Sequence, residues 1–258
     1  MISVITGASA GIGAAAASEL SRRGHKVVLV GRDAARLKAV AQGLTGPEPD
    51  VLTCDFTRLD DVRRLAADLR ERYERIGVLA NNAGVMSSTR QVTADGHELM
   101  IQVNHLAPFL LTHTLADHVD RVVTTSSMAG NSGRLDPGDL SRERRRWNGW
   151  LQYGDSKQAN ALFTVALAAR GTHATCFHPG VIRTGFAGDT WLMRLYLAVP
   201  GVAKSPEQGA KTLVHLATTE GESGRYYVKE APAGPGRGMR DPELADRLWE
   251  ASLSALNG

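Results

Sequence analysis

Short runs of apolar residues alternate along this chain with longer stretches in which apolar residues recur every three or four positions. The short runs lack a polar residue at every second place, which is typical of strands covered on both faces. Strands are therefore expected at residues 2–6, 27–30, 51–53, 78–81, 121–125 and 174–177. Helices are expected between and after them, at residues 11–23, 33–42, 59–73, 99–115, 153–170 and 242–256.

The repeated order of strand and helix predicts an α/β fold with a doubly wound parallel sheet. Successive parallel strands need right-handed crossover helices, and these helices cover both faces of the sheet. Neither a repeat of the solenoid kind nor a linker divides residues 1–258, so we expect a single domain. A stretch rich in Gly and Pro at 231–240 is expected to be a surface loop before the last helix.

Composition excludes several classes of function. The 258 residues are 43% hydrophobic and 22% charged, which is ordinary for a globular protein. A net charge of +3 without a dense Lys/Arg stripe argues against nucleic-acid binding. The N-terminus enters a strand at once, and no apolar run is long enough for stable insertion into a membrane. We therefore expect a cytoplasmic protein.

Cysteine and histidine usage predicts neither a disulfide framework nor a metal site. Cys54 and Cys176 are far apart in the sequence and each lies in an apolar run, so both are expected to be buried thiols. The 8 histidines are scattered, without His-Glu-x-x-His or paired cysteine spacing. No metal is expected.

The first predicted strand runs directly into a glycine-rich turn, Thr6 to Gly13, which opens the first helix. Glycine lets the backbone turn tightly and approach a pyrophosphate, while the helix N-terminus offers free N–H donors. Such a turn is weak evidence alone, but the strand before it and the helix after it strengthen the prediction. The expected cofactor contacts in this turn are Gly7, Ser9, Gly11, Ile12 and Gly13.

The spacing TGxxxGxG of this turn resembles the glycine motif of the short-chain dehydrogenase/reductase family, and further motifs of that family follow in the same order. Asn81 to Gly84 resembles its NNAG segment, and His178 to Thr184 its PG-x-x-x-T segment. The family's catalytic tetrad is matched by Asn104, Ser127, Tyr153 and Lys157. The resemblance covers nearly the whole chain and implies a Rossmann-type fold, an NAD(P) cofactor and hydride transfer at a carbonyl or alcohol carbon. Besides the tyrosine and lysine of the tetrad, it implies cofactor contacts from Asp55, Phe56, Asn82, Ala83, Gly84, Pro179, Gly180, Ile182 and Thr184.

The end of the second strand indicates which nicotinamide cofactor is used. Relatives that use NAD usually have an acidic residue there, whereas this chain has Gly31 followed by Arg32 and Asp33. A guanidinium can pair with a ribose 2′-phosphate, which an acidic residue at that corner would repel. We therefore expect NADP(H) to be preferred over NAD(H), with Arg32 and Ser9 contacting the phosphate. Asp33 close by argues against this preference, as does the lack of a basic residue in the glycine turn. The other interpretation is that Arg32 is a solvated residue at the helix start and Asp33 a helix N-cap.

Tyr153 and Lys157 are four residues apart at the start of a predicted helix, so their side chains lie on one face. A phenol has a pKa of about 10, and an ammonium roughly 4 Å away would favour the phenolate by about 4 kcal/mol, or roughly three pKa units. The spacing therefore predicts a Tyr153 pKa near neutrality, where acid–base catalysis is most efficient. Most Tyr-x-x-x-Lys pairs are ordinary helix surface, but the strand ending in Ser126 and Ser127 favours a functional pair here.

The resemblance gives each member of the tetrad a role. Tyr153 would donate a proton to the substrate oxygen, Ser127 would hydrogen-bond the same oxygen, and Lys157 would also hold the nicotinamide ribose. Asn104 would support a water that links Lys157 to solvent. Ser127 matches the family better than Ser126, which would point the other way along an extended segment.

The segment between Ser127 and Tyr153 is longer than in most relatives and contains an insertion at about 134–151. With the sequence around Tyr153 and near Trp249, this insertion resembles the retinol-dehydrogenase-like branch of the family. Its arginine-rich patch is expected to form a solvated helix face, with a face toward an anionic substrate or a membrane as the other interpretation: Arg142, Arg144, Arg145 and Arg146. Trp147 and Trp150 are expected to be packing anchors, with walls of the substrate pocket as the other interpretation.

The loop after the sixth strand, about residues 185–204, is rich in apolar and aromatic residues. It predicts either a lid over a bulky hydrophobic carbonyl or alcohol substrate, or a helix buried against the domain or a dimer partner. The resemblance leaves a homodimer or homotetramer open, with dimer faces on the helices from about Leu106 and Tyr153.

Three functions compete, in this order. An NADPH-dependent oxidoreductase explains the glycine turn and the tetrad together. A nucleotide-sugar epimerase or dehydratase shares the turn and the Tyr/Lys pair, but generally has a larger C-terminal substrate domain than the roughly seventy residues that follow Thr184. A non-catalytic NADP-binding sensor or scaffold would need the turn but not Ser127, Tyr153 and Lys157.

Overall fold

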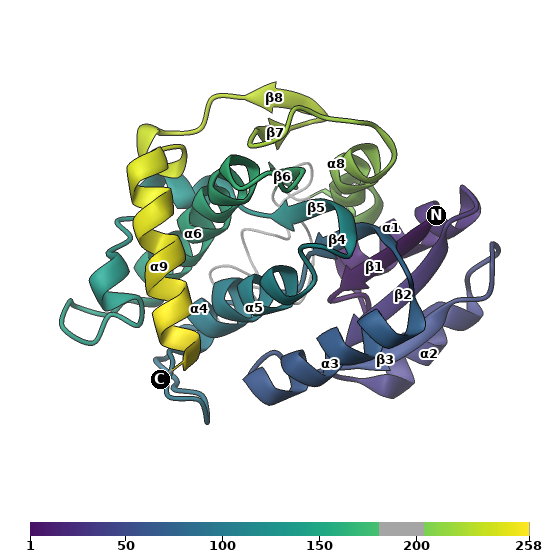
Figure 1. Ribbon diagram of the computed structural model, residues 1–258, viewed down its shortest axis with the longest axis horizontal. Helices are drawn as coiled ribbons and strands as arrows, with labels where there is room; N and C mark the ends of the chain where they lie inside the picture. The colour runs from purple at the N-terminus through teal and green to yellow at the C-terminus, as the bar shows by residue number, and fades with distance from the viewer. Residues whose placement is uncertain (181–203, 258) are drawn as a thin grey trace.

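Branched apolar residues build the centre of the sheet, because a strand covered on both faces needs side chains that pack in both directions. The computed structural model describes residues 1–180 and 204–257. Within them lies an eight-stranded sheet of order β3-β2-β1-β4-β5-β6-β7-β8 (Figure 1). All neighbours pair in parallel except β7 and β8, which pair antiparallel. The strands are β1 Ile2–Thr6, β2 Lys26–Gly31, β3 Asp50–Thr53, β4 Ile76–Asn81, β5 Val119–Thr125, β6 Ala174–His178, β7 Tyr226–Val228 and β8 Ala231–Ala233.

Two apolar clusters on opposite faces of the sheet hold the helices in place. One face packs against α1 (Gly11–Arg22), α2 (Ala34–Gln42) and α8 (Pro206–Thr218). The other packs against the helices α3 Leu59–Arg72, α4 Leu99–Ile101, α5 Ala107–Thr114 and α6 Gly149–Ala169, and a π-helical turn, Gln102–Leu106, joins α4 to α5. Short 3-10 turns cover Met128–Ser132, Pro137–Asp139 and Arg237–Met239.

The last helix, α9 (Pro242–Asn257), lies across α6 and α5 on the outside of that layer (Figure 1). Trp249 anchors it, with its ring centroid 4.9 Å from that of Phe109 and 6.1 Å from that of Phe163. The α9 helix thereby covers the helices from Leu106 and Tyr153 on which the resemblance places dimer faces.

The six strands and six helices expected from the sequence are all present, with small shifts at their ends. The α6 helix begins earlier than predicted, because the Asn148 side chain caps it by accepting from the backbone N–H of Trp150 at 3.0 Å. The prediction of a plain loop at 231–240 was wrong, since this stretch contains β8 and a 3-10 turn. The strand β7 and the helix α8 were not predicted.

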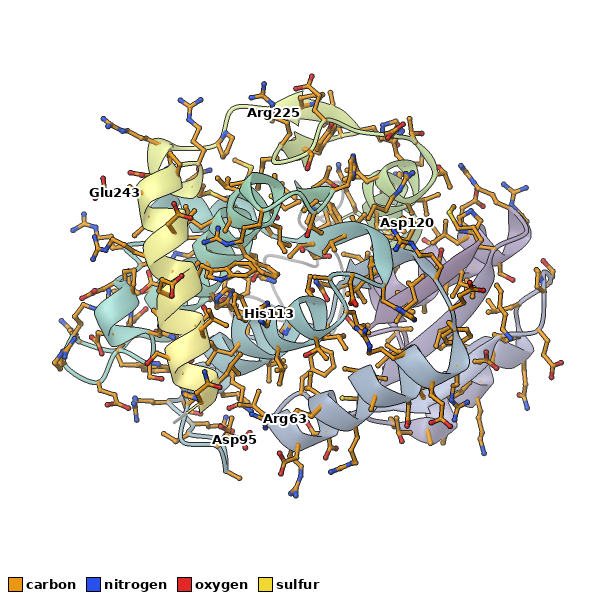
Figure 2. The ribbon with its side chains drawn as sticks, viewed as in Figure 1. Arg63, Asp95, His113, Asp120, Arg225 and Glu243 are labelled. Carbon is orange, nitrogen blue, oxygen red and sulfur yellow. The ribbon has the colours of Figure 1, made fainter. Side chains whose placement is uncertain are left out.

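Polar groups follow the expected division between surface and core. Charged side chains such as Arg63, Arg225 and Glu243 point away from the sheet in Figure 2.

Cys54 and Cys176 are buried free thiols, as predicted. None of the helices in the described part of the chain has the length and apolar content to cross a membrane. Residues 1–180 and 204–257 also contain no cluster of three His, Cys, Asp or Glu side chains that could hold a metal ion.

Candidate active site

The glycine turn after β1 lies where the strand order reverses, between β1 and β4, which is where parallel α/β sheets bind ligands. Gly7 and Gly11 have φ values of +67° and +58°, which side chains rarely adopt. A Cβ on Gly7 would lie 2.8 Å from Cα of Ala83, and one on Gly13 would lie 2.3 Å from the carbonyl oxygen of Gly7. Glycine is therefore required for this turn to pack against its neighbours.

The first turn of α1 is suited to an anion. Its N-cap residue, Ala10, provides no side-chain hydrogen bond, and the first turn contains no acidic residue. The unpaired N–H groups and the positive end of the helix dipole therefore face the glycine turn without a competing carboxylate. Ser9 and Ile12, two of the predicted cofactor contacts, are half-buried on this turn.

The segment after β4 supports the glycine turn directly. The Thr6 hydroxyl accepts from the backbone N–H groups of Asn82 and Ala83 at 3.0 Å and donates to the carbonyl of Ala80. The Asn82 side chain donates to the Thr6 carbonyl at 3.0 Å. The sequence predicted Asn82, Ala83 and Gly84 as cofactor contacts. The hydrogen bonds show that Asn82 and Ala83 hold the glycine turn in shape. Thr6 was not predicted, although its place at the end of β1 was a signal.

The residues expected to bind the adenosine end lie at the ends of β2 and β3. Arg32 is exposed, while Asp33 caps α2 by accepting from the backbone N–H of Arg36 at 3.0 Å and pairs with its guanidinium at 3.3 Å. The Asp33 carboxylate is thus bound to Arg36. Asp55 accepts from the backbone and the hydroxyl of Thr57, whereas the Phe56 ring is buried in the core cluster.

Ser127, Tyr153 and Lys157 meet at the carboxyl end of β5. The Lys157 ammonium donates to the Thr125 carbonyl at 3.2 Å and lies 5.7 Å from the centre of the Tyr153 ring. Ser127 hydrogen-bonds the Tyr153 hydroxyl and also accepts from the backbone N–H of Ala129. Ser126 points the other way, into the interior, and its hydroxyl donates to the Lys157 carbonyl at 2.7 Å. Ser127 is therefore the serine that faces Tyr153.

Burial dominates the electrostatics of this group. It raises the pKa of Tyr153 to about 12, although the hydrogen bond from Ser127 acts in the opposite direction. It lowers the pKa of Lys157 to about 8. The prediction that Lys157 brings the Tyr153 pKa close to neutrality was wrong for this structure. The ammonium attracts the phenolate, but the cost of removing a phenolate from water is larger and acts in the opposite direction.

Asn104 lies in the π-helical turn, a feature frequently found at functional sites. Its side chain accepts from the backbone N–H of Val85 at 2.7 Å and donates to the Val85 carbonyl and to the Ser156 hydroxyl, both at 3.0 Å. Asn104 therefore joins the segment after β4 to the residue preceding Lys157. Its side chain thus connects the segment after β4 with helix α6 by hydrogen bonds.

The insertion is anchored to α6 by buried charges, so the prediction of a solvated arginine face was wrong for Arg142 and Arg145. Arg142 pairs with Asp155 at 2.8 Å, and both side chains are buried. Arg145 pairs with Asp139 at 3.0 Å and lies 3.5 Å from Asp155. The segment 140–148 is irregular rather than helical, which lets neighbouring arginines turn inward. Asp155 was not predicted as a member of the site.

Trp150 is also placed differently from the prediction. It is 50% exposed, so it is not a packing anchor, and its ring centroid lies 6.3 Å from that of Tyr153.

The segment after β6 approaches the site from the other side. His178 accepts from the backbone N–H of Met128 at 3.4 Å, and burial lowers its pKa to about 4, so it is neutral. Gly180 has a φ of +94°, and the Lys204 side chain lies against it. Pro179, which lies between His178 and Gly180 in the sequence, is half-buried. Ile182, Thr184 and the predicted lid up to residue 203 lie outside the described residues.

Comparison with known proteins places the chain among dehydrogenases. Residues 1–194 match the sequence model described as short chain dehydrogenase. The chain is 41% identical to the "Putative daunorubicin C-13 ketoreductase DnrU" of Streptomyces sp. (strain C5), over 98% of this chain and 91% of that protein. It is 36% identical to retinol dehydrogenase 11 of Homo sapiens, over 98% and 85%. A crystal structure of an uncharacterized protein from Mycobacterium paratuberculosis is similar over 99% of this chain and 93% of that one, with a TM-score of 0.83 and 34% identity.

Proposed function

The chain belongs to the short-chain dehydrogenase family, in its retinol-dehydrogenase-like branch, and from this premise we propose that it reduces a bulky hydrophobic ketone or aldehyde with NADPH. Membership makes it an NAD(P)-dependent oxidoreductase. The choice of NADPH, the catalytic residues and the kind of substrate are the parts that we infer.

One observation supports the proposal above the others: the Tyr153 and Ser127 hydroxyls are hydrogen-bonded to each other beside the Lys157 ammonium. A substrate oxygen that accepts from both hydroxyls would be held at two points, which orients its carbon. A sensor or scaffold would need no such group. This arrangement therefore favours an enzyme.

The protonation states suit reduction. With a pKa of about 12, the Tyr153 phenol is protonated near neutrality and holds the proton that the substrate oxygen takes up. Ser127 donates to the same oxygen and stabilises the negative charge that develops on it. The Lys157 pKa of about 8 keeps most of the ammonium charged below that pH, so it favours proton loss from Tyr153 in the transition state.

NADPH would supply the hydride when bound. Its pyrophosphate would be held by the glycine turn and the first turn of α1, where no side chain or acidic residue takes up the N–H groups. Its 2′-phosphate would be paired by Arg32, with Ser9 adding a hydroxyl. The salt bridge between Asp33 and Arg36 supports this choice, because it gives the carboxylate that follows Arg32 in the sequence a basic partner of its own. Asp55 would hold the adenine.

A bulky apolar substrate is favoured by two relatives, which are named for daunorubicin and for retinol. A cytoplasmic location stays a prediction. So does a homodimer or homotetramer, which would have to use a surface other than the faces of α5 and α6 that α9 covers.

The proposed function is tested by mixing purified protein with NADPH and a panel of ketones, aldehydes and quinones, and following the near-ultraviolet absorbance of NADPH. We expect carbonyl-dependent loss of absorbance with NADPH and a much slower loss with NADH. Tight NADPH binding without turnover of any carbonyl would favour the sensor instead. Comparable rates with both cofactors would refute the part assigned to Arg32.

A further inference from the structure

Large apolar side chains are rarely exposed in the described residues, yet two of those that are lie beside the reacting groups. Met1, Val92, Met128 and Trp150 are 56%, 54%, 57% and 50% exposed. Single exposed apolar residues are common and need no explanation. Met128, however, directly follows Ser127, and Trp150 lies three residues before Tyr153 on the same helix.

The backbone of Trp150 is held by a hydrogen bond, and the residue is 50% exposed. Its N–H donates to the N-capping side chain of Asn148 at 3.0 Å, which fixes it in the first turn of α6. Its ring is tilted by 40° to that of Tyr153, at a centroid distance of 6.3 Å. A tryptophan that serves packing looks different: Trp249, on the buried face of α9, is 8% exposed. Trp150 therefore adds an exposed aromatic ring beside the ring of Tyr153.

Met128 directly follows Ser127 in the sequence and is 57% exposed. Its backbone N–H donates to His178, and it begins the 3-10 turn that Ser127 caps. A thioether side chain is flexible and makes favourable contacts with aromatic rings. A substrate whose oxygen accepts from Ser127 and Tyr153 would thus have a flexible apolar residue beside one donor and a flat aromatic residue beside the other.

We propose that Trp150 and Met128 bind the body of the substrate and make the enzyme selective for flat aromatic ketones over small aliphatic ones. This inference rests on the proposed function, since it takes Ser127 and Tyr153 as the point where the carbonyl oxygen is held. A ring that covers about 60 Å² of the exposed indole would bind about tenfold more tightly. Stacking adds about two- to tenfold more for an aromatic ring than for an aliphatic group of equal area.

The test compares kcat/KM for 2-acetonaphthone and 2,3-butanedione, with NADPH, in the wild type and in Trp150 variants. We expect Trp150→Ala to lower kcat/KM for 2-acetonaphthone at least about tenfold and to change that for 2,3-butanedione less than about twofold. Trp150→Phe should restore most of the loss, whereas Trp150→Leu, which keeps apolar area without a ring, should restore less. Met128→Ala should reduce the same preference, and Val92→Ala is the matched exposed control, expected to change neither value.

Binding of 2-acetonaphthone to the NADP⁺-loaded protein, measured by isothermal titration calorimetry, separates this proposal from the proposed function. Equal losses for both ketones in Trp150→Ala, or no loss of binding, would overturn the selectivity role while NADPH oxidation that depends on Tyr153 still stood. Binding that depends on Trp150 but is followed by no turnover would support Trp150 as a binding residue and refute the proposed reductase function. A wild type without preference for the aromatic ketone would overturn the proposal outright.

Discussion

Arg142 is the partner of a carboxylate that lies entirely in the interior, and replacing it by Ala would leave that charge unpaired. Asp155 is fully buried; it accepts from the Arg142 guanidinium at 2.8 Å and from the backbone N–H of Arg134 at 2.7 Å. Removing one partner of a buried ion pair typically costs about 3–5 kcal/mol. Arg145, 3.5 Å away, remains as a weaker partner, so we expect about 3 kcal/mol for Arg142→Ala.

The stability that Arg142→Ala loses should depend on pH. Burial already raises the pKa of Asp155, and Arg142 acts against that rise. Without Arg142 the folded-state pKa rises further, so the folded protein binds a proton that the unfolded chain has released. A group with a raised folded-state pKa loses stability as pH increases. The difference between variant and wild type should therefore be smaller at mildly acidic pH than at mildly alkaline pH.

Urea unfolding followed by circular dichroism measures this difference, with Arg146→Ala as the matched control. Arg146 belongs to the same arginine-rich segment but is exposed, and its replacement should change stability by less than about 0.5 kcal/mol. Equal effects of the two substitutions, or a loss below about 1 kcal/mol for Arg142→Ala at every pH, would refute the reasoning. The insertion would then be held by its other contacts.

Three further predictions concern the cofactor site and the core. Arg32→Ala should weaken NADPH binding at least about tenfold and NADH binding far less, measured by fluorescence titration; equal weakening would mean that Arg32 does not contact the 2′-phosphate. Gly13→Ala should destabilise the protein by about 1–3 kcal/mol and reduce NADPH affinity, because its Cβ would lie 2.3 Å from a backbone oxygen, whereas Gly43→Ala, with its nearest atom at 3.5 Å, should do neither. Trp249→Ala should cost about 3–5 kcal/mol in chemical unfolding because the ring is buried between α9, α5 and α6; a loss near zero would mean that α9 is not packed as described.

The parts of the fold that could be predicted are those in which local pattern and tertiary role agree. The strands β1, β2 and β4 are buried on both faces, and their apolar runs show it directly. The three-residue strand β8 has the sequence Ala-Pro-Ala, which lacks the branched residues typical of strands and forms only because β7 lies beside it. The helix α8 could have been predicted, since Ser205 and Gln208 form a capping box around Pro206.

Within the candidate site, the sequence predicts which residues meet but not their surroundings. The order of motifs indicated Ser127, Tyr153 and Lys157, and the structure brings them together at the end of β5. Burial decides the direction of the Tyr153 pKa shift, and burial depends on every element packed around the site. The inward turn of Arg142 likewise depends on Asp155, thirteen residues further along the chain, which composition does not show.

The most direct test of the central claim is the turnover of Tyr153→Phe, which removes one hydroxyl and keeps the ring. We expect this variant to fold, to bind NADPH, and to lose at least about a hundredfold in kcat for any ketone that the wild type reduces. Turnover at the wild-type rate would contradict the account, because Tyr153 could then not be the group that gives its proton to the substrate oxygen.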